Sequence, residues 1–116
     1  MLAEIDGPML AEAFPTEHFP EAMIAAGETV RLLAAKQWTE RFAVQVACQT
    51  VLIPVRLRFE SDRLTLTPMD DAWRFARALQ TRSNDGFERQ HALHDLLENP
   101  PAWAAPFIIA LVGEYI

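Results

Sequence analysis

The sequence predicts a mainly all-α fold, a compact helical bundle of about five helices within one domain of 116 residues. Three observations predict it. Apolar residues recur at a spacing of three or four in several segments, which is typical of amphipathic helices. Proline or a capping residue stands where several of these segments begin. A continuous apolar run at 107–112 needs the rest of the chain to cover it.

Composition indicates a protein that builds its core without cross-links. Hydrophobic residues make up 51% of the chain, which contains a single cysteine, Cys48. One cysteine forms no intrachain disulfide, and this fits the reducing cytoplasm. The N-terminus has no secretory signal pattern, and no apolar run approaches the ~20 residues that span a bilayer. We therefore expect a cytoplasmic protein without a membrane segment.

The negative charge lies at one end of the sequence. The net charge is −6, and the first 30 residues contain six acidic residues and no Lys or Arg. The remaining chain holds ten basic and ten acidic residues. Because phosphate backbones attract basic surfaces, we expect no nucleic-acid partner. An acidic face favours a basic protein partner instead.

Residues 1–19 form an acidic N-terminal arm in this interpretation, and residues 20–116 form the helical body. Turn signals at Asp6-Gly7-Pro8 and at Pro15 divide the arm. We expect it to dock on the body through its apolar side chains, which are Leu2, Ile5, Leu10 and Phe14. A frayed terminus is the alternative.

The first two helices of the body are predicted at 20–36 and 38–53. Pro20 suits the first position of a helix. In the second segment apolar residues line two faces, which is typical of a helix packed between neighbours. Cys48 falls within this segment, where a thiol is usually inert packing rather than a nucleophile. Pro54 ends the helix or kinks it.

Residues 55–67 allow two interpretations. Leu57 and Phe59 alternate with arginines, and Leu64 and Leu66 alternate with polar residues. This period of two predicts a short β-hairpin with one apolar face. The alternative is a helical turn after Pro54 followed by a loop.

The third helix is predicted at 68–82, since Thr67 is a capping residue and Pro68 suits the first helical position. The next is predicted at 85–98, because Asp85 followed by Glu88 resembles a capping box.

The last helix is predicted at 106–116. It is nearly all apolar, with Glu114 as its only charge. It either lies in the middle of the bundle or leaves an apolar patch that a second copy or a partner buries. This second alternative predicts a homodimer through the helix. We expect Trp73, Leu93 and Ile109 in the core.

The C-terminal third to half of the chain resembles HEAT- or armadillo-type helical repeats, including uncharacterised bacterial proteins of this kind. An Asp85-Gly86-Phe87 turn enters a helix with Arg89 and the pair Ala92-Leu93. Trp103 to Phe107 then opens a second helix, which closes on 111–116. The resemblance implies a HEAT-like bundle that binds protein and carries no catalytic residues. Residues 1–66 show no such period.

Glu88, His91 and Asp95 lie on one side of the helix predicted at 85–98. Glu-x-x-His is half of a carboxylate-bridged di-iron site, and the sequence has no second copy of it. We expect a solvated helix face, with a metal-binding protein or an enzyme using these three residues as the alternative. The four glycines are scattered, so no phosphate-binding loop is present.

The leading functional prediction is a small protein-interaction module, an adaptor or an inhibitor. It needs no cofactor, and no catalysis is expected.

Overall fold

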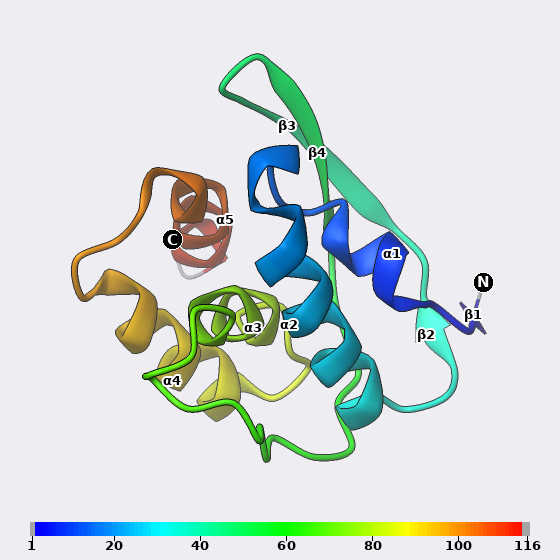
Figure 1. Ribbon diagram of the computed structural model, residues 1–116. Coiled ribbons are helices and arrows are strands. Elements are labelled where there is room, and N and C mark those ends of the chain that lie inside the picture. Colours follow the sequence, from blue (N-terminus) through cyan, green and yellow to red (C-terminus); the bar gives the residue numbers. More distant parts are fainter. Residues whose placement is uncertain (1, 115–116) are drawn as a thin grey trace.

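The computed structural model describes residues 2–114 and shows an α+β fold with 48% helix and 18% strand (Figure 1). The predicted all-α, HEAT-like bundle is therefore wrong. The elements in chain order are β1 (Leu2–Ala3), α1 (Gly7–Ala11), η1 (Thr16–His18), α2 (Phe19–Leu32), β2 (Gln37–Trp38), β3 (Arg41–Val46), β4 (Gln49–Pro54), α3 (Trp73–Gln80), α4 (Gly86–Leu97), η2 (Ala102–Ala104) and α5 (Ala105–Gly113).

The β3–β4 hairpin replaces the helix predicted at 38–53. Val46 pairs with Gln49 across a two-residue turn, and Ala47 and Cys48 both have positive φ, 50° and 67°. Positive φ at both central residues is the geometry of a type I′ turn, whose twist matches that of the strands. The segment is rich in Val, Thr and Ile, which favour strands over helices.

The second two-stranded sheet pairs β1 with β2, antiparallel, so that Leu2 lies opposite Trp38. It ties the first described residues of the chain to the segment that precedes the hairpin. The side chain of Gln37 in β2 is buried, donates to the carbonyls of Ala34 and Arg58, and accepts from the backbone N–H of Arg58. Each of its polar atoms is therefore satisfied inside the fold.

Residues 55–67 do not form the predicted hairpin, nor a helical turn followed by a loop. The segment forms neither helix nor strand and makes isolated bridges, Leu33 with Phe59 and Leu57 with Ser83. The N–H of Leu57 donates to the carbonyl of Arg82 at 2.7 Å, and the N–H of Asn84 donates to that of Leu57 at 2.8 Å. These residues pair with distant segments rather than with one another.

Four of the five predicted helices have counterparts with shifted ends. The α2 helix ends at Leu32, because Leu33 takes an extended conformation. The α3 helix starts only at Trp73, since the N–H and hydroxyl of Thr67 bond the Asp70 carboxylate and close a separate turn. The α4 helix starts as predicted, because the Asp85 carboxylate accepts from the N–H groups of Phe87 and Glu88. Within residues 2–114, no helix is long and apolar enough to cross a membrane.

The core is built around four buried aromatic side chains that come from distant parts of the chain, Phe14, Phe75, Trp103 and Phe107. Phe14 and Leu10 are buried, so the N-terminal arm docks on the body as expected and is not frayed there. Leu2, by contrast, stays exposed.

The α5 helix buries only one side. Phe107 and Leu111 are fully buried, whereas Ile109 is 70% exposed and Val112 43% exposed. Of the three residues expected in the core, Trp73 and Leu93 are half-buried and Ile109 is a surface residue. The prediction that α5 lies in the middle of the bundle is wrong, because only one of its faces meets the body. Residues 115 and 116 of the predicted helix lie outside the described residues.

Candidate functional site

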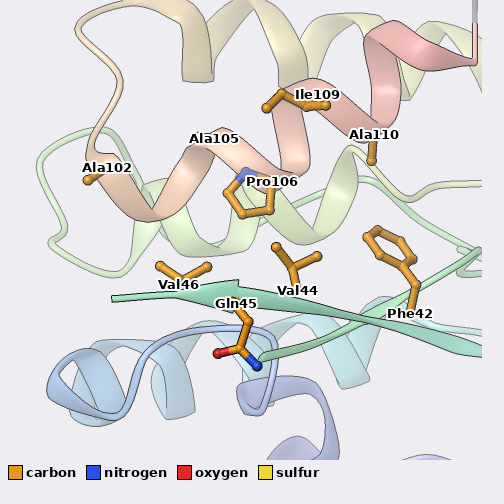
Figure 2. Close-up of a pocket in the computed structure, with 9 residues that line it drawn as sticks. All are labelled: Phe42, Val44, Gln45, Val46, Ala102, Ala105, Pro106, Ile109 and Ala110. Carbon is orange, nitrogen blue, oxygen red and sulfur yellow. The ribbon is translucent and has the colours of Figure 1, made fainter. Parts of the chain in front are cut away.

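An apolar groove lies between the hairpin and the C-terminal helix. Its volume is about 400 Å³. Figure 2 shows Phe42, Val44 and Val46 pointing from β3 toward α5, where Pro106 and Ala110 face them. The complete lining is Phe42, Val44, Gln45, Val46, Ala102, Ala105, Pro106, Ile109 and Ala110. None of these side chains is charged, so the groove is suited to apolar groups.

The groove exists because β4 sits on the core and β3 extends beyond it. Val51 and Ile53 in β4 are buried, whereas their cross-strand partners Val44 and Phe42 in β3 are only half-buried. Paired residues share one face of a hairpin. The inner face of β3 therefore overhangs α5 without being covered by it.

The outer edge of β3 is open. The N–H of Leu52 in β4 donates to the carbonyl of Glu12 at 2.9 Å, away from β3. Ala43 is the cross-strand partner of Leu52, so its N–H and C=O groups point away from β4. The same holds for Gln45, because alternate residues of an antiparallel strand point their backbone groups to the same side. In the described part of the chain, the N–H and C=O groups of Ala43 and Gln45 have no hydrogen-bond partner. An unpaired edge of this kind is a template for an additional strand.

Two of the three residues predicted as a metal-site alternative, Glu88 and Asp95, contact Arg77 instead. Nε of Arg77 lies 2.8 Å from Oδ2 of Asp95, and its Nη1 lies 4.0 Å from Oε1 of Glu88. His91 is exposed. No group of three His, Cys, Asp or Glu residues in 2–114 is placed to hold a metal ion. The carboxylates on this side of α4 attach it to α3.

Glu88 nevertheless has an unusual environment. Burial, followed by the nearby charge of Asp62, raises the pKa of Glu88 to about 7 against the lowering effect of Arg77. The side chain is only 9% exposed, and Oε1 has no hydrogen-bond partner among residues 2–114. It lines a small polar cavity of about 240 Å³ together with Asp62 and Asp85. Glu88 is therefore protonated in part near neutral pH.

Cys48 is not packed within a helix. It occupies the hairpin turn, where its side chain is exposed. The prediction of a buried, inert thiol is therefore wrong, and its cause is the assignment of 38–53 to a helix.

The groove is not predicted by the sequence patterns. Its β3 wall consists of Phe42, Val44 and Val46, every second residue of a strand. A helical interpretation of 38–53 divides the same residues between two faces. The signal that distinguishes the two is the high content of Val, Thr and Ile between Phe42 and Ile53.

The chain matches no protein-family model, no curated protein and no solved structure. The resemblance of its C-terminal part to helical repeats therefore stays a prediction.

Proposed function

We propose that this protein is a small cytoplasmic interaction module, an adaptor or an inhibitor without catalytic activity, that binds an extended segment of a partner protein. The observation that carries the proposal is the apolar groove beside the open edge of β3. Backbone donors and acceptors and an uncovered apolar surface occur there together, and strand addition uses both.

In this proposal the partner segment pairs with β3. Its backbone bonds the outward N–H and C=O groups of Ala43 and Gln45. Because side chains alternate along a strand, every second side chain of the segment enters the groove over Val44 and reaches Ile109. Removing this apolar surface from water contributes roughly 25 cal/mol per Å². The backbone hydrogen bonds to β3 provide affinity, and the groove selects apolar residues at alternate positions of the segment.

The charge distribution supports a basic sequence around such a segment. The net charge of −6 comes from the first 30 residues, and Glu4, Asp6, Glu12 and Glu17 are exposed among them. Charges of opposite sign speed the encounter of two proteins and contribute less to the final affinity. Association with a basic partner should therefore slow as salt is added.

A displayed library of ten-residue segments with apolar residues at alternate positions tests the proposal. We expect selected segments to bind the protein and to protect the amides of Ala43 and Gln45 from hydrogen exchange. Ile109→Glu places a charge in the groove and should weaken binding on the order of tenfold or more. Ala43→Pro removes an outward N–H without touching the hairpin ladder, and should also weaken it.

Ile24→Glu is the matched control, since Ile24 is an apolar residue of α2 that is 58% exposed and lies outside the groove. It should leave binding unchanged. Selected segments that bind Ile109→Glu as well as the parent protein would contradict the proposal. Light scattering on the protein alone tests whether a second copy of the chain fills the groove. A dimer that Ile109→Glu dissociates would show that a second copy fills the groove in place of a partner.

A further inference from the structure

Three arginines from different parts of the chain converge on one carboxylate. Nη2 of Arg82 lies 2.7 Å from Oε1 of Glu114. Nη2 of Arg56 and Nε of Arg89 lie 3.2 Å and 3.8 Å from Oε2 of the same side chain. Arg56 follows β4, Arg82 follows α3, and Arg89 belongs to α4. We call Arg56, Arg82 and Arg89 the arginine cluster.

The arginine cluster is held in place by the backbone as well as by Glu114. The carbonyl of Ser83 accepts from Nη1 of Arg56 at 3.1 Å and from Nη1 of Arg89 at 2.8 Å. Arg82 donates to the carbonyls of Pro54 and Val55, at 3.1 Å and 2.8 Å. These contacts do not involve α5. The guanidinium groups are therefore positioned before any carboxylate reaches them.

One carboxylate does not balance three guanidinium groups. Within residues 2–114, no other carboxylate lies within 4.0 Å of the arginine cluster. The Arg82 side chain is only 3% exposed, and its Nη1 has no hydrogen-bond partner among the described residues. Nε of Arg89 is likewise buried without one. A buried donor without an acceptor is costly, so the cluster has both charge and donors available for an anion.

We propose that the arginine cluster is a binding site for a phosphate monoester, and that the carboxylate of Glu114 occupies it in the absence of this ligand. A phosphate group carries up to two negative charges and three acceptor oxygens, which matches several guanidinium forks better than a carboxylate does. The ligand replaces Glu114, whose side chain is 26% exposed and follows directly after α5. None of the three arginines lines the groove, although the Arg82 guanidinium lies 5.7 Å from the centroid of the Phe42 ring. The inference does not depend on the proposed function.

Titration with inorganic phosphate, followed by ³¹P NMR and by thermal unfolding, tests the site in the parent protein and in Glu114→Gln. Sodium chloride at the same ionic strength is the control for screening. If Glu114 fills the site most of the time, removing its charge should tighten phosphate binding on the order of tenfold, because the fraction of open sites rises. Phosphate should also raise the melting temperature of Glu114→Gln more than chloride does. O-phosphoserine in a parallel titration distinguishes an esterified phosphate from the free ion.

Arg89→Gln removes one guanidinium of the arginine cluster from a side chain that is 18% exposed, and should abolish binding. If Arg89→Gln does not fold, Arg56→Gln takes its place, and we expect it to abolish binding as well. The side chain of Arg56 is 28% exposed. The matched control is Arg63→Gln, an exposed arginine outside the cluster that should bind phosphate as the parent does. If Glu114→Gln binds phosphate no more tightly than the parent, or if Arg63→Gln loses binding as Arg89→Gln does, the proposal is wrong. In that case the arginine cluster serves only to hold α5 on the body through the ion pairs with Glu114.

Discussion

Phe75 and Trp103 stack on each other with 4.2 Å between ring centroids and 14° between ring planes. Phe14 stands edge-on to both rings, at 5.1 Å and 5.3 Å. Phe14 precedes the first long helix, Phe75 lies in α3, and Trp103 lies in the turn before α5. The centre of the core is thus a contact among three segments that are far apart in the sequence.

Phe14→Ala should reduce the free energy of unfolding by about 3–5 kcal/mol, because it removes a buried ring and leaves a cavity between two others. Denaturant unfolding measures this change. Phe87→Ala is the matched control, since Phe87 is 85% exposed and its truncation should cost little. A loss below about 1 kcal/mol for Phe14→Ala would show that residues 10–14 are not part of the cooperative core.

Stability should decrease as the pH rises from about 5 to about 7, owing to Glu88. In the unfolded chain Glu88 ionises near its ordinary value of 4.5, whereas burial raises the pKa of the folded-state carboxyl to about 7. Between these values the folded state holds a proton that the unfolded state has released, so unfolding becomes more favourable with pH. The contribution is on the order of 3 kcal/mol and levels off above about pH 7.

Denaturant unfolding at a series of pH values, repeated on Glu88→Gln, measures this contribution. The amide keeps the shape of the side chain and cannot ionise. The stability of the variant should therefore not decrease between about pH 5 and pH 7, and the variant should be more stable than the parent at pH 8. Glu98→Gln, an exposed residue that follows α4, is the control. An unchanged pH profile in Glu88→Gln would contradict the assignment.

The hairpin turn should be improved by residues that accept positive φ. Ala47 and Cys48 both adopt the left-handed conformation, which costs a residue with a Cβ about 1–2 kcal/mol. The double change Ala47→Asn and Cys48→Gly introduces the pair that type I′ turns favour. We expect the free energy of unfolding to rise by about 1–2 kcal/mol. Cys48→Ser alone keeps a Cβ at this position and should give no gain.

The thiol of Cys48 should react in the native state. It is exposed at the end of the hairpin, so a disulfide reagent such as DTNB should modify one equivalent per chain without denaturant. Cys48→Ser should show no reaction. Modification that requires denaturant would mean that the hairpin turn is covered in solution.

The sequence is informative where local chemistry and tertiary structure agree. The capping pattern of Asp85 and Glu88 correctly predicts the start of α4, and Pro20 lies at the start of α2. The motif at Thr67 and Asp70 is misleading, because the same hydrogen bonds that begin a helix also close an isolated turn. A cap identifies a turn, and the packing of the next residues decides whether a helix continues.

The hairpin and the candidate site could not be predicted from local patterns. The turn between β3 and β4 contains no Gly, Asn or Asp, so the usual sequence evidence for a type I′ turn is missing. Without a recognised turn, the apolar residues of 41–54 also fit two faces of a helix. The groove escapes prediction for the same reason, because one of its walls is a strand. The arginine cluster depends on tertiary contacts among residues 56, 82, 89 and 114, which leave no local pattern in the sequence.

The aromatic core also constrains how the protein acquires its structure during synthesis. Phe14 is made early, but its partners Trp103 and Phe107 are made only after α2, the hairpin, α3 and α4. Until these partners appear, the ring of Phe14 lacks two of its three aromatic neighbours and is open to other chains. Contacts of such long sequence separation raise the contact order, which slows folding. The completed core therefore forms only after Phe107 has left the ribosome, and the nascent chain is the form most exposed to aggregation.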